Sequence, residues 1–276
     1  MDQPPRLTDR PALERNRARA ARNPALFLHD WVADEIEERL KEVNRSFTET
    51  AVVTTQQGVW ADRIPAARLI TDDETLDVQT AAHDLVIHCL CLHWANDPVG
   101  QIAQSRLALR PDGLFLGALF GGQTLNELRI CLAEAEASIS GGLSPRVAPM
   151  GEIRDLGALL QRAGLALPVA DSQPLTVSYE NAFALMKDLR AMGESNAMEQ
   201  RLRRPTARSV LVRAAELYST NFAQPDGRIR ATFEIVFLTG WAPSENQPKP
   251  LRPGSAKARL ADALGTSETP VAGSRD

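Results

Sequence analysis

The apolar run at residues 84–92 constrains the fold of this chain more than any other segment. It reads Asp-Leu-Val-Ile-His-Cys-Leu-Cys-Leu, so nearly every position is apolar rather than every second one. Such a strand is typical of a parallel sheet that helices cover on both faces. A helix near residues 97–109, a turn at 111–113 and a second buried strand at 114–120 are predicted to follow. This order predicts right-handed βαβ units, and therefore an α/β fold with a mostly parallel sheet.

The rest of the chain fits the same class. An amphipathic helix is predicted at residues 24–44, and Thr124 and Glu127 form a predicted capping box that opens a helix reaching about residue 137. The other predicted elements are short strands at 52–55 and 68–71, helices near 155–163, 181–192 and 206–223, late strands at 176–179 and 232–239, and a short helix near 256–264 in a proline-rich tail.

Composition narrows the function classes. The net charge of −4 gives no electrostatic reason to bind nucleic acid or an anionic membrane. Three cysteines, Cys89, Cys91 and Cys131, favour a reducing compartment, and we expect the first two to be buried thiols. No apolar run approaches the ~20 residues of a membrane span. The arginines before residue 23 have no apolar core beside them, so we expect a solvated basic arm or helix, no secretory signal or transit peptide, and a cytoplasmic protein.

Three histidines share the strongest strand and its end. His83, His88 and His93 are five residues apart, so successive ones point to opposite faces, which excludes a three-histidine metal site. His93 and Trp94 stand where a parallel strand ends, the usual place for ligands in open α/β sheets. His93 is therefore the candidate general base or substrate contact, with a hydrogen-bonded histidine beside a packing tryptophan as the alternative.

Several loops combine glycine with polar residues. Gly121 and Gly122 predict a close-approach turn that holds an anion or a peptide backbone, or a tight turn alone. Residues 141–146 predict a flexible loop for a lid or a partner, or a plain connector. The candidate substrate and partner residues are Gly121, Gly122, Ser144, Arg146, Arg190, Glu194 and Asn196; the last three otherwise form an exposed helix end. Arg201, Arg203, Arg204 and Arg208 could dock an acidic partner or form a solvated turn.

Residues 92–97 and 106–115 resemble the central strand and following turn of class I S-adenosylmethionine-dependent methyltransferases. The segments 120–125, 141–146, 188–196 and 238–241 are similar to the methyltransferase-like assembly factors of respiratory NADH dehydrogenase (complex I), a branch related to the malonyl-carrier methyltransferase of biotin synthesis. The mitochondrial member of that branch is a protein-arginine hydroxylase. The resemblance implies a Rossmann-like class I methyltransferase fold with a late antiparallel strand, S-adenosylmethionine as cofactor, and a complex I subunit as the protein substrate.

The chain departs from that family after its first predicted strand. The family carries a glycine-rich turn there, which lets the backbone approach the cofactor, whereas residues 54–58 read Thr-Thr-Gln-Gln-Gly. Only 12 residues separate Thr55 from Arg68, which is short for a crossover helix. The cofactor candidates are Thr54, Gly58, Asp72, Asp73, His93 and Trp94, with Asp72 or Asp73 as the ribose or adenine partner or as part of a polar turn.

The predicted organisation has three parts. Residues 1–23 form the basic arm, residues 24–242 a single methyltransferase-like domain, and residues 243–276 the proline-rich tail. Within the domain, 24–82 is a reduced cofactor lobe and 83–242 holds the core and the substrate side. Two functions stay open. One is an enzyme that modifies a protein side chain, by methyl transfer or arginine hydroxylation, and methyl transfer depends on alignment rather than on a dedicated catalytic residue. The other is a non-catalytic assembly factor or chaperone that has lost the cofactor.

Overall fold

The computed structural model describes residues 6–247, and almost all of them belong to one compact unit that ends at Pro243. Its sheet has the order β2-β1-β3-β4-β6-β5. The strands are β1 Thr50–Val53, β2 Arg68–Ile70, β3 His83–Cys89, β4 Leu109–Phe120, β5 Ala166–Tyr179 and β6 Ile229–Trp241. Neighbouring strands from β2 to β4 are parallel, whereas β6 is antiparallel to both β4 and β5. The predicted mostly parallel sheet with a late antiparallel strand is confirmed.

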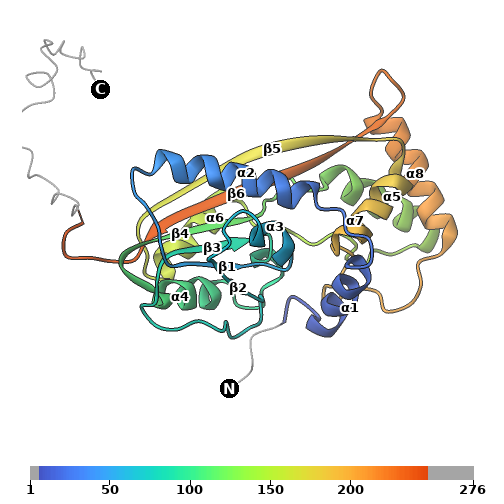
Figure 1. Ribbon diagram of the computed structural model, residues 1–276. Helices are drawn as coiled ribbons and strands as arrows, with labels where there is room; N and C mark the ends of the chain where they lie inside the picture. The colour runs from blue at the N-terminus through green and yellow to red at the C-terminus, as the bar shows by residue number, and fades with distance from the viewer. Residues whose placement is uncertain (1–5, 248–276) are drawn as a thin grey trace, which may run out of the picture. The chain divides into compact units, whose positions relative to one another are not determined.

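Helices cover both faces of this sheet (Figure 1). They are α1 Arg10–Ala20, α2 Phe27–Glu42, α3 Gln57–Ala61, α4 Pro98–Ala108, α5 Asn126–Ser140, α6 Ile153–Arg162, α7 Ala182–Met192 and α8 Arg208–Phe222, with a 3-10 turn at Leu92–Trp94. Strand alternation divides the core. Val52 and Ile87 pack in one cluster with α2, α5, α7 and α8, whereas Val53 and Val86 pack in the other with α4 and α6. The apolar run that predicted a strand buried on both faces therefore lies at the centre of three layers.

Two local predictions at the ends of β4 are wrong. The predicted turn at 111–113 is a bulge inside β4, where the register against β3 shifts and Asp112 has a φ of +65°. The predicted capping box does not cap α5, whose N-cap residue is Leu125. Instead, the Thr124 hydroxyl donates to the Glu234 carbonyl at 3.1 Å, and the Glu127 carboxylate accepts from Thr232. Both side chains bond to β6 because this strand lies beside the start of α5.

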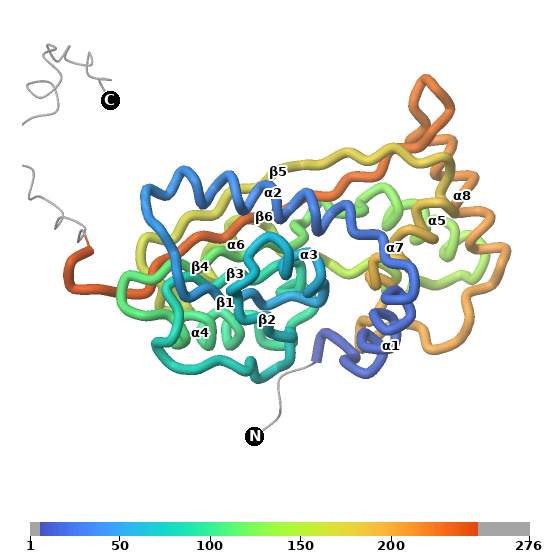
Figure 2. The backbone as a smooth tube through the Cα atoms, in the orientation of Figure 1, coloured from blue at the N-terminus to red at the C-terminus, as the bar shows by residue number. Residues whose placement is uncertain are grey.

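The N-terminal segment is a helix over residues 10–20, one of the two predicted forms, but one side of it is buried rather than solvated. It forms α1, which begins with an Asp9 cap and packs beside α7, as the tube in Figure 2 shows. Leu13 is fully buried, and the side chains of Arg10 and Arg17 are only 13% and 15% exposed. The tail prediction, with its helix near 256–264, falls beyond residue 247 and outside the described residues. Among residues 6–247, no helix has both the length and the apolar character to cross a membrane.

Candidate functional site

The carboxyl ends of β1, β2 and β3 bring most of the predicted cofactor residues to one edge of the sheet. Thr54 follows β1, and Asp72 follows β2. After β3, Leu90 adopts a φ of +49° and the chain turns into the 3-10 segment that carries His93 and Trp94. The side chains of Thr54, Asp72, His93 and Trp94 are all buried at this edge.

Two arginines of α1 form ion pairs with the Asp72 carboxylate. Arg17 Nη1 donates to Asp72 Oδ1 at 2.8 Å and to Oδ2 at 3.1 Å. Arg10 donates to Oδ2 at 3.2 Å and to the Asp72 carbonyl at 2.8 Å. The Asp72 side chain is 1% exposed, whereas that of Asp73 is 66% exposed and lies 3.8 Å from Arg10. Both carboxylate oxygens of Asp72 therefore serve the N-terminal helix rather than a ligand.

The buried Arg17 also balances the charge behind this edge. Burial lowers the pKa of Arg17, but neighbouring acidic groups that include Asp72 and Glu194 outweigh that effect and raise the pKa above its ordinary value. Burial raises the pKa of Cys91 well above its ordinary value, and its thiol donates to the Cys89 carbonyl. Cys91 is therefore a neutral structural thiol rather than a nucleophile, and both Cys89 and Cys91 are buried as predicted.

A second buried group joins residues from both sides of the domain. Trp94 Nε1 donates to Glu194 Oε2 at 2.7 Å, and His93 Nε2 lies 3.2 Å from the same oxygen. Burial raises the pKa of Glu194. His93, Arg17 and the Trp94 hydrogen bond together lower it by more than burial raises it, so the pKa of Glu194 lies below its ordinary value. Glu194 follows Gly193, which ends α7 at a φ of +85°. His93 is thus held by a buried carboxylate that the sequence placed in a separate candidate group.

A cavity of about 270 Å³ opens beside His93 and Trp94. Its other walls come from residues 6–8, 145–149 and 198–200. Asn196 fixes one wall to another, because its Nδ2 donates to the Pro145 carbonyl at 2.9 Å. Glu194 and Asn196 therefore both bond to residues in the cavity walls, whereas Arg190 is exposed on α7.

The remaining predicted substrate residues bond within the chain. A Cβ at Gly121 would stand 2.7 Å from Glu234 Oε2, and the same oxygen accepts from Gln123 N, so this chain's own carboxylate fills the close-approach turn. Glu152 approaches Gly122 in the same way. These contacts leave the turn no room for an external anion.

The predicted cation of the 141–146 loop also faces inward. Arg146 Nη2 pairs with Glu136 Oε1 at 2.5 Å, and the Ser144 hydroxyl donates to the same carboxylate at 2.8 Å. Arg146 also donates to the Thr206 hydroxyl. These bonds lower the pKa of Glu136 to about 2, led by the contact with Arg146. Ser144 and Arg146 thus fasten the loop to α5 and to the segment before α8.

The edge does not fit S-adenosylmethionine in this conformation. Gly58 lies inside α3, and a Cβ there would meet nothing within 4 Å, so this glycine supports no close approach of protein atoms. Trp60 of α3 is fully buried in the core cluster of β1, β3 and α2. Asp72 offers no accessible oxygen to ribose hydroxyls. The five-residue helix α3 is all that the short crossover holds.

Arg10 and Arg17 are the site residues that the sequence interpretation missed. Their signal was present: Asp9 precedes Arg-Pro, a typical helix start, and the two arginines are seven residues apart and therefore share one helix face. Nothing in the local sequence indicated that their partner would be Asp72, 55 and 62 residues away.

Comparison with known proteins gives a consistent assignment. No family model matches the chain. It is 41% identical over 197 residues (71% of this chain, 45% of the relative) to the mitochondrial arginine-hydroxylase NDUFAF5 of Dictyostelium discoideum. It is 35% identical over 180 residues (65% of this chain, 59% of the relative) to the malonyl-[acyl-carrier protein] O-methyltransferase of Xylella fastidiosa. A solved structure described as a methyltransferase of Bacillus halodurans aligns with a TM-score of 0.46 and 12% identity, covering 75% of this chain and 98% of that one.

The chain is therefore similar in sequence to the NDUFAF5 arginine-hydroxylases and to the malonyl-carrier O-methyltransferases. Its sheet combines parallel strands with one antiparallel strand. The chain spans 45% of the length of the Dictyostelium relative and 62% of that of a Danio rerio relative.

Proposed function

We propose that this chain is a protein-binding assembly factor for respiratory NADH dehydrogenase, built on a methyltransferase fold whose cofactor edge is closed. The observation that carries the proposal is the burial of Asp72 between Arg10 and Arg17. The family resemblance makes Asp72 or Asp73 the candidate partner of the ribose or adenine. Here an S-adenosylmethionine molecule would have to displace two guanidinium groups and the helix that carries them.

The partner is inferred from the sequence resemblance. The segments similar to complex I assembly factors include Glu194 and Asn196, which hydrogen-bond to Trp94 and Pro145 in the walls of the 270 Å³ cavity. A closed cofactor edge beside an open cavity favours binding over chemistry. The cellular location stays a prediction. The composition favours the cytoplasm, whereas the NDUFAF5 relatives are named as mitochondrial proteins.

A second candidate is an enzyme that modifies a protein side chain, as the name of the Dictyostelium relative suggests for that protein. Buried polar atoms near His93 favour it. Arg17 Nη2, His29 Nδ1 and His93 Nδ1 are inaccessible to solvent and have no hydrogen-bond partner among the described residues. Buried polar groups without partners are rare, so these three atoms fit a small polar ligand that binds after a movement of α1.

A gene deletion tests the proposal and separates the candidates. Loss of this chain should reduce the amount of assembled NADH dehydrogenase on native gels, and a plasmid copy should restore it. Mass spectrometry of the subunits in the same strains then decides between binding and chemistry. A methyl or hydroxyl group that disappears with the gene would establish the enzyme. Unchanged assembly in the deletion strain would contradict the assembly factor, and unchanged assembly together with unchanged subunit modifications would contradict both candidates.

A further inference from the structure

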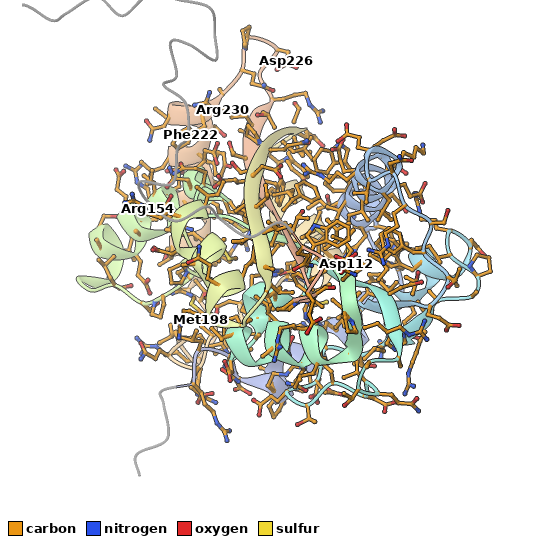
Figure 3. The ribbon with its side chains drawn as sticks, turned by 90° about the vertical axis from the view of Figure 1, so that its left-hand side faces the viewer. Asp112, Arg154, Met198, Phe222, Asp226 and Arg230 are labelled. Atoms are coloured by element: carbon orange, nitrogen blue, oxygen red, sulfur yellow. The ribbon has the colours of Figure 1, made fainter. Side chains whose placement is uncertain are left out.

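We propose that the cavity beside Trp94 and the arginines around it form a docking surface for an acidic protein segment that inserts one large apolar side chain. The inference rests on the proposed function, because it names the chemistry of the partner segment. This cavity, the anchor pocket, has apolar walls formed by Leu7, Trp94, Pro145, Ala148, Pro149 and Met198. Figure 3 labels Met198 on the face it shows.

The walls of the anchor pocket are fixed before any partner arrives. Residues 7–9 pair with 197–199: Thr8 and Met198 form an antiparallel bridge, and Glu199 N donates to the Leu7 carbonyl at 2.9 Å. Asn96 Oδ1 accepts from the backbone N–H of both Leu7 and Thr8 at 2.9 Å. Preformed walls lower the entropy that binding must overcome.

The size and lining of the anchor pocket suit one side chain. Sites for complete small ligands are usually about 300–1,000 Å³, so 270 Å³ lies below that range. Leu7 stands at the wall with 62% of its surface exposed, and Trp94 and Met198 supply soft apolar contacts. An aromatic or long aliphatic side chain in such a pocket is the usual anchor of a protein interface.

The charge around the anchor pocket selects the flanks of that segment. Its segments contribute Arg6, Arg201, Arg203 and Arg204, with Arg146 already neutralised by Glu136. The acids among them are Asp9, which binds Arg201 and Arg203, and Glu199, which binds Arg203. Glu194, which bonds to His93 and Trp94, is a third acid at the pocket wall. Four cations against three anions leave an excess of one positive charge, on a chain whose net charge is −4. Local positive charge on an acidic protein favours a short acidic segment over a basic one.

The test begins with a phage-displayed library of random peptides selected on the full chain. Binding of the selected peptides is then measured by fluorescence anisotropy at low and high salt. Leu7→Asp puts a negative charge into the pocket wall, and Arg204→Glu reverses the charge of an exposed arginine four residues after the wall residue Gln200. The matched controls are Leu107→Asp, a leucine 51% exposed on α4, and Arg110→Glu, an exposed arginine at the start of β4. Thermal melting of all four variants shows that each is folded.

We expect selected peptides to carry an aromatic or long aliphatic residue next to aspartate or glutamate, and to bind more weakly at high salt. Leu7→Asp and Arg204→Glu should each weaken binding at least tenfold, and the controls less than twofold. Basic peptides, peptides without an apolar anchor, or equal binding by all folded variants would overturn the proposal. So would tighter, Arg204-dependent binding of single-stranded RNA or of vesicles of anionic lipid. S-adenosylmethionine binding by the chain would contradict the closed edge but not this surface.

Discussion

Replacing Arg17 with methionine removes the cation that links the two buried carboxylates of the closed edge. Methionine keeps most of the apolar stem, so the packing of α1 against its neighbours should change little. Asp72, 1% exposed, then keeps only Arg10, whose Nη1 lies 3.2 Å from Oδ2. Glu194 loses one of the cations that keep its pKa low.

The expected loss follows from breaking a buried pair on one side. Removing one partner of such a pair typically costs about 3–5 kcal/mol, because a charge is left buried without compensation. Arg10 retains part of the compensation at Asp72, and the Arg17 side chain is 15% exposed. We therefore expect Arg17→Met to lower the free energy of unfolding by about 2–3 kcal/mol, a large share of the ~5–15 kcal/mol typical of a domain.

Urea unfolding followed by tryptophan fluorescence measures this loss. The matched control is Arg15→Met, an exposed arginine of the same helix, which should change the free energy by less than about 0.5 kcal/mol. Adding Asp72→Asn to Arg17→Met should recover part of the loss, because the uncompensated charge is then absent. If Arg17→Met and Arg15→Met cost the same, Asp72 is not held by α1 and the closed edge is refuted.

Three further predictions concern His29, the Arg146–Glu136 ion pair and the glycines at positions 58 and 121. Burial lowers the pKa of His29 to about 4, so the unfolded chain takes up a proton below pH ~6.5 while the folded chain does not. The free energy of unfolding should therefore fall by about 2–3 kcal/mol between pH 6.5 and 4. His29→Met should flatten this pH dependence in urea titrations, and an unchanged pH dependence would contradict the assignment to His29. Arg146→Ala should lower the free energy of unfolding by about 2–4 kcal/mol at pH 7 in thermal unfolding, because it leaves the buried Glu136 carboxylate without its cation. The wild-type ion pair stabilises the fold fully above pH ~4.5, and this contribution is lost as the pH falls toward 2. Equal stabilities of the variant and the wild type at pH 7 would refute this prediction. Gly58→Ala should be neutral or stabilising by up to ~1 kcal/mol, whereas Gly121→Ala should destabilise by about 1–3 kcal/mol because its Cβ would meet Glu234. A reversed order in urea midpoints would show that position 58, inside α3, needs its glycine.

The layers of this fold could be predicted because strand burial is written in the local sequence. The buried runs around Ile87 and Leu116 marked two neighbouring parallel strands, and the helices near α2, α4, α6, α7 and α8 followed from their apolar spacing. Thr124 and Glu127 could not be predicted in the same way. They match a capping pattern locally, but both side chains hydrogen-bond to strand β6, more than a hundred residues later in the chain, instead of capping α5.

The candidate site was predicted in pieces rather than as an arrangement. His93 and Glu194 were both expected, but 101 residues separate them, and only the folded chain shows that one carboxylate holds both His93 and Trp94. Arg146 was expected to face a partner and instead binds Glu136, because the loop folds back onto α5. A sequence can show which residues carry charge, whereas the partner of each charge is a property of the tertiary fold.

Isothermal titration of S-adenosylmethionine and S-adenosylhomocysteine into the full chain tests the central claim most directly. The closed edge, with Asp72 buried against Arg10 and Arg17, predicts no binding heat at millimolar concentrations of either compound. Parallel thermal scans should show no shift in melting temperature. Saturable binding with a micromolar dissociation constant would show that α1 yields to the cofactor, and would contradict the proposal that this homologue works as a binding protein rather than an enzyme.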